Sequence, residues 1–597
     1  MNTLQNIRQF LNRSTLPSSG RLYFASILVG IIAGLGAILF FTCLGWLTHL
    51  FLHQIGQYYP PEPAGEQSGY AATGMPIRWG LIWLIPAIGG LLSGLLVFLF
   101  APEAEGHGTD AVIEAFHHKR GLIRKRVPMI KTLASIITIG TGGSAGREGP
   151  IAQIGAGFGS YLASILRLTD DERRILLVSG AAGGVGAIFR SPLGGALFAV
   201  EVLYKRDFEA RALIPALISS IVAYSIFASI FGWELLFKTP AYVFREPLEL
   251  PFYAGLGLVC ALVGLFYIKV FYGLRDRLFR ALPLPQTLTP AVGGLLIGGL
   301  GIFAPHVLAS GYGYLQQAMD GSLTLKFMFM AAVLKILATS FTISSGGSGG
   351  VFAPSLFIGG MLGGSYGALA SQLFPDAVSQ PNAFVLVGMG AFFAGVAKVP
   401  ISSMIMVSEM TGGYQLLVPM MLASATAYVV TSRITLYEKQ VNRMADSPAH
   451  MGDFTVDVLD TLSVEEAYRS RQNVPVIEQS TPLLEIQHLV SQREENQFPV
   501  VDKKGSIVGI LSMRYVRSVL FEEGMGSFLI VQDLMTKPVT VTPAESLRSA
   551  LKKFIESEYD QIPVVDMRDE SRILGLISYE DIIETYNREV AKRKAPL

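Results

Sequence analysis

Long apolar stretches alternate with short polar ones along the chain as far as Arg433. From Leu22 to Phe51 no Asp, Glu, Lys or Arg interrupts the sequence, which is long enough for one tilted helix across a bilayer. Further apolar stretches lie at Ile82–Phe100, Leu213–Phe231, Pro251–Phe271, Pro290–Phe303, Phe327–Ile343, Leu356–Leu373, Phe384–Val396 and Leu416–Thr431. Several are short or contain Gly and Pro, a pattern that favours broken and re-entrant helices over a row of full spans.

A basic stretch, Glu105–Arg126, separates two of these apolar regions. Lys and Arg next to membrane spans are typical of the cytosolic side, so we place this stretch in the cytosol. The same argument places the N-terminal segment there, with its Arg8, Arg13 and Arg21. That segment has no apolar core of its own before Gly20, so we do not expect a cleaved signal peptide.

After Arg433 the sequence changes to the charged pattern of a water-soluble domain. This tail is duplicated, because Thr481-Pro482-Leu483 recurs as Thr542-Pro543-Ala544 and Phe498–Asp502 recurs as Ile562–Asp566. In each copy a helical stretch precedes a short buried strand, a charged turn, a second strand and another amphipathic helix. We predict two β-α-β-β-α units that pack against each other.

A longer duplication runs through the apolar part of the chain. Ser144–Pro150 reads SAGREGP, and 204 residues later Ser348–Pro354 reads SGGVFAP, so that Ser, Gly and Pro recur in register. Lys131 matches Lys335 at the same spacing. At a spacing of 208, the segment from Gly180 through Arg190 to Glu201 matches the segment from Gly388 through Lys398 to Glu409. We predict two membrane repeats, at about 22–235 and 250–437.

The duplicated motif has the properties of an anion site. A glycine-rich break before a helix directs free N–H groups and the positive end of the helix dipole at whatever lies ahead. An ionised residue such as Glu148 is tolerated at membrane depth mainly where it faces a polar cavity or a pathway. One break in each repeat therefore indicates an anion site near the middle of the membrane. Close packing of helices through small residues is the alternative explanation for the glycines.

Composition supports a membrane protein and excludes other classes. The chain has 597 residues, of which 51% are hydrophobic and only 16% charged. The net charge of +1 gives no reason to expect nucleic-acid binding, which needs a basic patch or stripe. Cys43 and Cys260 lie in apolar stretches and form no metal-ligand spacing, so we expect no metal site and no disulfide framework.

The motifs resemble those of the CLC chloride channels and transporters, and the tail resembles a tandem pair of CBS domains. The resemblance covers nearly the whole chain after about residue 22. Gly146–Pro150 matches the family's GREGP motif, Gly350–Pro354 matches its GxFxP motif, and Tyr437 matches its anion-coordinating tyrosine. The fold class that this implies is a polytopic α-helical membrane protein with the inverted-repeat CLC fold, followed by an α/β cytosolic CBS pair.

We divide the chain into a cytosolic N-terminal segment (1–21), a transmembrane domain (22–437), a linker (438–470) and two CBS copies (471–530 and 531–590). The expected location is a prokaryotic cell membrane, with several spans and with the CBS tail in the cytosol.

The resemblance implies a homodimer in the lipid bilayer, with one chloride pathway in each subunit and Glu148 as its gate. A carboxylate at a helix N-terminus occupies the place of an anion, and its protonation removes that competition. The expected anion-binding residues are His107, Gly146, Arg147, Gly149, Val351, Phe352 and Tyr437. Backbone N–H groups solvate an ion without full positive charges, so the ion is held weakly enough to leave.

One departure from the family pattern concerns His107. The GSGIP motif appears here as Gly106-His107-Gly108-Thr109-Asp110, with His107 where the coordinating serine usually stands. A neutral imidazole donates one hydrogen bond, and a protonated one adds a positive charge. Either His107 coordinates chloride and makes conduction sensitive to pH, or it points away and a backbone amide takes over.

A second departure concerns proton coupling. In exchangers of this family an inner glutamate passes protons to the gate, and the matching position here is Val202, next to Glu201. Valine cannot carry a proton, and the resemblance says that channel members often have valine there. This favours passive conduction, with chloride/proton antiport through a water chain or His107 as the alternative. Glu201 and Glu409 are expected to be structural.

For the tail, the resemblance implies an adenine nucleotide as a ligand of the CBS pair. Ser578 and Asp581 stand at the spacing where CBS domains use a hydroxyl and a carboxylate on ribose. In the first copy Ser512 is present but Tyr515 replaces the acid, so one half-site is complete. A CBS pair that only dimerises and braces the membrane domain is the alternative.

Three other functions were weighed against chloride transport. A membrane-embedded hydrolase would use Ser348 as nucleophile, but it needs a base within reach and His306 is the one histidine in the second membrane repeat. A nucleotide sensor with a membrane anchor needs one or two spans, not two repeats with buried charge. Fluoride export is a further option in the family, and the retained Phe352 and Tyr437 favour chloride. We therefore expect a transport protein and not an enzyme.

Overall fold

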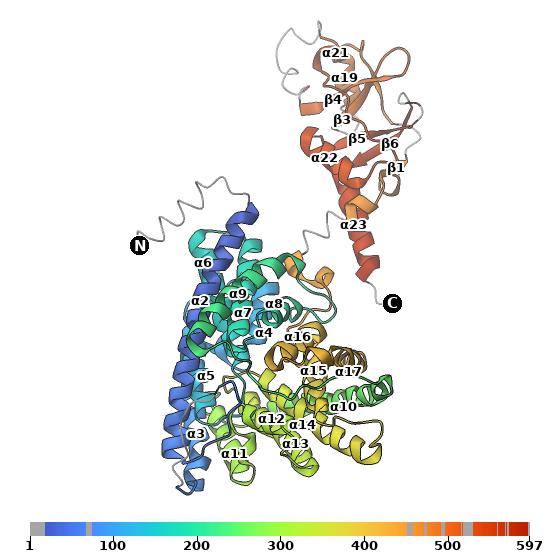
Figure 1. Ribbon diagram of the computed structural model, residues 1–597. Helices are drawn as coiled ribbons and strands as arrows, with labels where there is room; N and C mark the ends of the chain where they lie inside the picture. The colour runs from blue at the N-terminus through green and yellow to red at the C-terminus, as the bar shows by residue number, and fades with distance from the viewer. Residues whose placement is uncertain are drawn as a thin grey trace. The chain divides into compact units, whose positions relative to one another are not determined.

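The computed structural model describes residues 18–66, 75–450, 458–470, 474–490, 496–514, 516, 529–557, 559–567, 569 and 572–594. Arg8 and Arg13, Tyr515 and the second helix expected in the first CBS copy fall largely or wholly outside them. The chain divides into two compact units, Met1–Ala449 and His450–Leu597. As predicted, a helical unit is followed by a unit that contains strands and helices (Figure 1).

The described part of the first unit contains two successive series of eight α-helices. The first series is α2 (Ser18–Thr48), α3 (Trp79–Phe100), α4 (Thr109–His118), α5 (Arg126–Gly140), α6 (Glu148–Leu166), α7 (Asp170–Ile188), α8 (Pro192–Glu201) and α9 (Ala210–Phe231). The second series is α10 (Leu250–Leu274), α11 (Thr289–Phe303), α12 (Tyr312–Met319), α13 (Leu325–Ser344), α14 (Phe352–Leu373), α15 (Ala383–Ala397), α16 (Pro400–Thr411) and α17 (Leu417–Val430).

Short π and 3₁₀ segments extend or connect these helices. The π segments are η1 (His49–Ile55), which continues α2, and η4 (Arg275–Phe279), which continues α10. The 3₁₀ segments are η2 (Pro102–Ala104), η3 (Pro247–Glu249), η5 (Pro305–Val307), η6 (Tyr414–Leu416), η7 (Met444–Asp446) and η8 (Pro448–His450).

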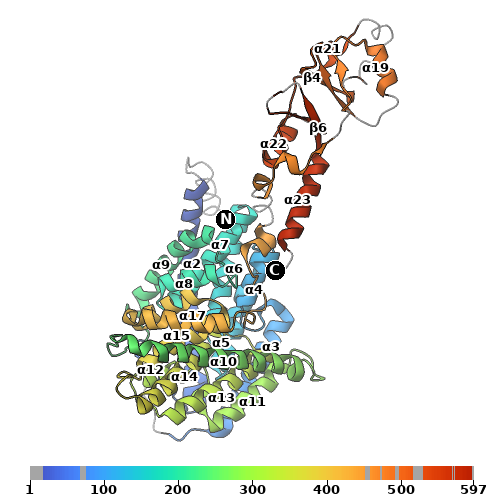
Figure 2. The same ribbon diagram turned by 90° about the vertical axis from the view of Figure 1, so that its right-hand side faces the viewer.

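The two series pack in the same order. Helix α6 lies against α7 as α14 lies against α15, and α2 lies against α9 as α10 lies against α17 (Figures 1 and 2). The pairs α3·α5 and α11·α13 match in the same way, as do α7·α8 and α15·α16. The helical unit is therefore built from two structural repeats, as the duplicated sequence indicates.

Every predicted apolar stretch lies within or overlaps a helix, and the helices are of mixed length. Within the described ranges, five are long and apolar enough to cross a membrane: Gly20–Ile55, Trp79–Phe100, Ala210–Phe231, Pro247–Phe279 and Leu325–Ser344. Shorter apolar helices include α11 and α15, with 15 residues each. The polar stretch predicted at Glu105–Arg126 contains helix α4. Polar residues lie among helices that are buried in the protein, which is where broken and re-entrant segments are tolerated at membrane depth.

Glycines bring matching helix pairs into backbone contact. A Cβ atom on Gly155 of α6 would lie 2.1 Å from the carbonyl oxygen of Gly180 on α7. In the second repeat, a Cβ on Gly359 of α14 would lie 2.4 Å from the carbonyl oxygen of Gly388 on α15. Small residues allow such close approach, which is a main source of helix association in membranes.

The second unit contains two three-stranded sheets. One sheet has the order β2-β3-β4, with β2 (Ile477–Glu478) parallel to β3 (Gln497–Val501) and β3 antiparallel to β4 (Ile507–Ser512). The other has the order β1-β6-β5, all antiparallel: β1 (Arg469–Ser470), β6 (Ile573–Ser578) and β5 (Gln561–Val565). The accompanying helices are η9 (Val464–Glu466), α19 (Leu483–Val490), α21 (Val531–Leu534), α22 (Leu547–Ser557) and α23 (Tyr579–Lys594).

The first residues of each copy in this unit pair with the sheet of the other copy. Strand β1 pairs with β6 of the second copy, and Thr536 pairs with Ile510 of β4 in the first. The segment expected as a linker, 438–470, belongs to both units: Val441 pairs with Tyr204 in the helical unit, whereas Val464 packs in the core of the second sheet. Two copies joined this way fold as one body.

Candidate functional site

The two glycine-rich breaks meet at the centre of the helical unit. Gly146 and Gly350 form an antiparallel bridge, in which the Gly146 N–H donates to the Gly350 carbonyl at 2.7 Å and the Gly350 N–H donates back at 2.6 Å. These two residues stand at the same position in the two repeats. Helix α6 begins at Glu148 and α14 begins at Phe352, so the bridge brings both N-termini to one place.

The Glu148 carboxylate lies between these two helix starts. It is 2% exposed, and its Oε1 accepts a hydrogen bond from the backbone N–H of Phe352. A Cβ atom on either Gly146 or Gly350 would lie 2.1 Å from a carboxylate oxygen. A side chain at either position would displace the carboxylate of Glu148, because the carboxylate packs directly on the two backbones. A negative group therefore occupies the place where two helix dipoles converge.

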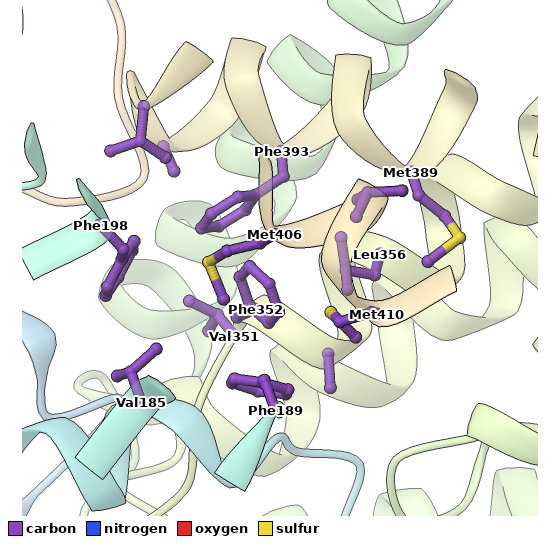
Figure 3. Packing of buried hydrophobic residues seen from close by; sticks show 14 of the residues in the cluster. Val185, Phe189, Phe198, Val351, Phe352, Leu356, Met389, Phe393, Met406 and Met410 are labelled. Carbon is purple, nitrogen blue, oxygen red and sulfur yellow. The ribbon is translucent and has the colours of Figure 1, made fainter. Parts of the chain in front are cut away.

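Phe352 holds the second helix start in position through its ring. The ring centroid lies 4.9 Å from that of Phe189 and 4.4 Å from that of Phe393 (Figure 3). Val351, the residue before it, is also buried in this cluster. The N–H that faces Glu148 is thus fixed by packing in the core. The two predicted residues Val351 and Phe352 lie beside Glu148, as the sequence interpretation required.

Two buried lysines hold matching loops on either side of this centre. Lys131 donates to the carbonyl oxygens of Ala104 and Gly106, at 3.0 and 2.7 Å. Lys335 donates to those of Val307 and Ala309, at the same distances. The sequence revealed the lysine pair, but not that each lysine anchors a loop. The loops also share their backbone shape, since Gly108 and Gly311 both have φ +80.

The first of these loops lines a cavity of about 860 Å³ with His107 on its wall. It is named the inner cavity after the cytosolic side expected for Glu105–Arg126, and the cavity of the second loop is named the outer cavity in the same sense. The Nε2 of His107 lies 3.3 Å from a carboxylate oxygen of Asp110, and its ring centroid lies 5.2 Å from that of Tyr437. Thr109 interacts with the side chain of Tyr437. The backbone carbonyl of His107 packs on Gly149, where a Cβ would lie 1.8 Å away. The structure therefore brings together His107, Tyr437 and the start of α6.

Tyr267 belongs to the same surroundings and was missed in the sequence. It lies on α10, is fully buried, and interacts electrostatically with both Glu148 and Tyr437. Its hydroxyl has no hydrogen-bond partner among the described residues. A single tyrosine in an apolar helix gives no sequence signal, because nothing in the pattern tells which side of the helix faces the site.

The second loop lines an outer cavity of about 390 Å³. Arg147, predicted to bind the anion, lies on its wall and is paired with Glu66 by two hydrogen bonds, of 2.5 and 3.0 Å. Arg190 and Tyr312 line the same cavity. Glu66 lies in no recognisable motif, so a carboxylate paired with Arg147 could not be expected from the sequence.

Glu201, at the end of α8, caps the start of α16, and Glu409, near the end of α16, caps the start of α8. Glu201 accepts hydrogen bonds from the N–H groups of Ile401 and Ser402 at the start of α16. Glu409 accepts from the N–H groups of Leu193 and Gly194 at the start of α8. Both carboxylates are thus held as helix caps in matching places of the two repeats.

Val202 follows Glu201 directly and is buried, with 3% of its surface exposed. Its backbone carbonyl accepts a hydrogen bond from the Gln440 side chain at 3.0 Å. An apolar side chain that is packed in this way supplies no proton-accepting group at that position.

The serine that a hydrolase would use is engaged elsewhere. Ser348 Oγ lies 2.9 Å from Ser135 Oγ and donates to the Ala104 carbonyl at 3.0 Å. Neither partner is a base that accepts a proton from a nucleophile.

In the tail, Ser578 and Asp581 bond to each other at the start of α23. The Ser578 hydroxyl donates to Asp581 at 2.6 Å and accepts from the Asp581 N–H at 3.2 Å. A cavity of about 640 Å³ next to them is lined by residues of both copies, including Gln497, Tyr559 and Ser578. The predicted hydroxyl therefore faces a cavity, whereas the carboxylate is 7% exposed and does not line it.

Comparison with known families decides between these interpretations. The sequence model of the family described as "Voltage gated chloride channel" matches residues 89–432, and the CBS domain model matches residues 464–522 and 531–588. This chain is a CLC protein. Its activity is therefore CLC-type anion transport across a membrane, and it is an integral membrane protein.

Named relatives of this CLC protein include bacterial proteins of both functional types. It is 33% identical over 393 residues to a "Putative chloride channel protein ClcB-like" of Ralstonia nicotianae, with 64% of this chain and 90% of that protein covered. It is 30% identical over 430 residues to an "H(+)/Cl(-) exchange transporter ClcA" of Vibrio campbellii, with 71% and 89% covered.

Solved CLC structures confirm the predicted fold class. A slow cyanobacterial Cl⁻/H⁺ antiporter matches at 25% identity with a TM-score of 0.62, over 70% of this chain and 95% of its own. A CLC-type fluoride/proton antiporter matches at 22% identity with a TM-score of 0.60, over 72% and 100%. A eukaryotic CLC transporter matches at 20% identity with a TM-score of 0.56, over 94% and 97%.

Proposed function

We propose that this CLC protein transports chloride by passive conduction and that Glu148 is its gate. The observation that supports the gate is the position of the carboxylate between the N-termini of α6 and α14, on Gly146 and Gly350. An anion needs the same N–H groups. Protonation removes the charge of Glu148, and the side chain then no longer competes with chloride for them.

On the inner side, Tyr437, His107 and the N–H of Gly149 are proposed to accompany the ion. Tyr437 and His107 are neighbours, and His107 faces the inner cavity. Since Asp110 engages Nε2 of His107, the ring is oriented with Nδ1 away from that carboxylate. Nε2 carries the hydrogen that Asp110 accepts, so Nδ1 carries one as well only in the imidazolium form. In that form His107 donates to chloride from Nδ1, which is the role that a serine hydroxyl has elsewhere in the family.

Passive conduction is favoured by the residues around Val202. Its side chain accepts no proton, and the neighbouring Glu201 is held by Ile401 and Ser402 as a helix cap. Fixed hydrogen bonds of this kind oppose repeated protonation during transport. Chloride/proton antiport remains the second candidate, because one 30% identical relative is named an exchanger.

The test measures chloride efflux from liposomes that contain the purified protein, with and without a proton ionophore, while external pH is recorded. We expect chloride efflux without proton movement in a fixed ratio. Glu148→Gln is expected to conduct at a rate that no longer changes with pH. Proton uptake driven by a chloride gradient, and abolished by Glu148→Gln, would establish antiport and contradict the interpretation of Val202.

A homodimer, an adenine nucleotide at the CBS pair and a cytosolic position of both termini complete the proposal. The nucleotide proposal rests on Ser578 at the wall of the cavity between the two CBS copies. Equilibrium dialysis with ATP tests it, with Ser578→Ala as the variant expected to bind less. If the ATP concentration is the same in the chambers with and without protein, the CBS pair binds no ATP and keeps only a bracing role.

A further inference from the structure

The outer cavity is rich in hydrogen-bond donors. Arg147, Arg190 and Tyr312 line it, and they are 6%, 6% and 3% exposed. The Nε atoms of both arginines and the hydroxyl of Tyr312 have no hydrogen-bond partner among the described residues. Buried donors are nearly always satisfied in folded proteins, so these three residues of the cavity wall keep hydrogen-bonding capacity that the described residues leave unused.

Two guanidinium groups and the carboxylates of Glu62 and Glu66 line this cavity, so an anion is favoured next to the arginines once Glu66 leaves Arg147. Both guanidinium groups are permanently positive. Arg147 is paired with Glu66, whereas Arg190 donates to the neutral carbonyls of Phe231 and Glu234. Glu66 and both arginines interact electrostatically with one another. Glu66 is therefore in direct contact with one cation, Arg147, and interacts electrostatically with a second, Arg190.

Glu66 reaches Arg147 from a loop that is itself anchored. The loop Tyr58–Glu66 joins η1 to the region before α3. The hydroxyl of Tyr58 donates to the Pro305 carbonyl at 2.8 Å, and the Gly65 N–H donates to the Leu236 carbonyl at 3.0 Å. These bonds hold both ends of the loop, so the carboxylate of Glu66 is presented to the cavity at a fixed place.

The cavity also adjoins the gate motif. Ala145 and Arg147, the residues on either side of Gly146, line it. Its opposite wall is the loop Leu308–Tyr312, which corresponds in the second repeat to the loop that contains His107. The outer cavity is therefore bounded by the matching loop of the second repeat, with Arg147 of the gate motif on its wall.

We propose that Arg147, Arg190 and Tyr312 form an outer binding site for a small inorganic anion such as the transported halide, and that Glu66 is a tethered carboxylate that competes for it. An anion from outside takes the place of Glu66 on Arg147, and Glu66 returns when the ion leaves. Two carboxylates then stand in series along the pathway, Glu66 at the outer site and Glu148 at the centre. This inference rests on anion transport by the family, and not on the gate or on passive conduction.

The direct test locates bromide by anomalous diffraction in crystals of the full chain. Glu66→Gln keeps the shape of the side chain and removes its charge. In this variant we expect a bromide peak within contact distance of Arg147 and Arg190 at a concentration where the wild type shows none. In the wild type, a peak is expected only at higher bromide, together with movement of Glu66 away from Arg147.

Two results would overturn the proposal. One is the absence of bromide at the arginines in both proteins at every concentration. The other is a bromide peak in the wild type while Glu66 stays paired with Arg147, because competition is then excluded. The wild-type titration gives an answer even if Glu66→Gln does not fold.

A solution measurement separates this site from the gate. Equilibrium dialysis with radioactive chloride is expected to give one more bound ion per chain in Glu66→Gln than in the wild type at low chloride. Arg190→Met in the Glu66→Gln background is expected to remove that extra ion. Glu246→Gln, an exposed carboxylate that does not line this cavity, is the control and is expected to bind like the wild type. An unchanged count in Glu66→Gln contradicts the proposal, whatever Glu148→Gln does to chloride flux.

Discussion

The two repeats of the helical unit share their supporting contacts and differ at the point where they meet. Ser144 contacts Thr339, and the matching contact joins Ser348 to Ser135. The lysine anchors and the glutamate caps are duplicated in the same way. At the centre, however, one repeat has Glu148 and the other has Phe352. The scaffold is symmetric and the chemistry is not.

This difference explains how one pathway arises from two halves. Both repeats supply a helix N-terminus with free N–H groups, and only one supplies a group that can be charged or neutral. If both positions were glutamates, two negative charges would share one small space, which strongly disfavours ionisation of both. Phe352 instead fixes its N–H through aromatic packing and leaves the carboxylate of Glu148 as the single titratable group between the helix starts.

The largest expected effect comes from breaking the mirrored lysine anchors. Lys131→Met and Lys335→Met each remove a charged donor from two carbonyl oxygens of a loop. Hydrogen bonds to charged groups are worth about 1.5–3 kcal/mol each, and we expect each variant to lose ~3 kcal/mol of unfolding free energy. Thermal unfolding in detergent measures this. Unequal losses in the two variants would show that the anchors are not equivalent.

A smaller effect is expected from the mirrored caps. Glu201→Gln and Glu409→Gln keep one acceptor oxygen each and lose the charge that strengthens the bonds to two N–H groups. We expect a loss of about 2 kcal/mol for each variant. Glu234→Gln is the control, because its pair with Lys238 is exposed and contributes little. Differential scanning calorimetry compares the three. If Glu234→Gln loses as much unfolding free energy as the two cap variants, the role given to the caps is refuted.

Substitution of the asymmetric position sharpens the comparison further. Phe352→Leu removes the ring contacts with Phe189 and Phe393. We expect a loss of about 1–2 kcal/mol of stability. The N–H that Glu148 uses is then less firmly positioned, so chloride efflux should depend less on pH than in the wild type. A variant with unchanged pH dependence would show that the ring serves only the core.

The duplicated tail offers the smallest effect. Burial alone raises the pKa of Glu545, but Lys553, the Thr542 N–H and Ser549 lower it more, so that the net pKa is below the ordinary value. Leu484 stands at the matching position of the first copy. A depressed pKa contributes stability above the ordinary carboxyl pKa, and that stability is lost as pH falls through the folded value.

Unfolding of the CBS unit at pH 7, 5 and 4 tests this contribution. The wild type is expected to lose more stability between pH 5 and pH 4 than Glu545→Gln does. If the stability of the two proteins changes equally with pH, Glu545 makes no such contribution.

The sequence predicted the duplicated scaffold well because its signals are local. Gly146, Glu148 and Phe352 could be placed at helix starts from glycine-rich breaks alone, and the repeat placed them at one centre. Glu66 and Tyr267 could not be found, because their roles depend on contacts far along the chain. Glu66 lies in a loop without a motif and meets Arg147, 81 residues later. Tyr267 looks like any other apolar-helix tyrosine.

The first residues of the CBS copies show a similar limit. Strand β1 pairs with β6, which comes more than a hundred residues later, so no local pattern marks where the first copy begins.

The bridge between Gly146 and Gly350 also sets the order in which the protein can be completed during synthesis. A ribosome makes the GREGP segment about two hundred residues before the segment that pairs with it. Until then Glu148 has no N–H of α14 from which to accept a hydrogen bond. The first repeat alone therefore leaves its carboxylate without the contacts that Gly350 and Phe352 provide. Closing so long a loop is slow, and contacts of high sequence separation form late in folding. The proposed chloride pathway is therefore expected to be among the last parts of the membrane domain to form.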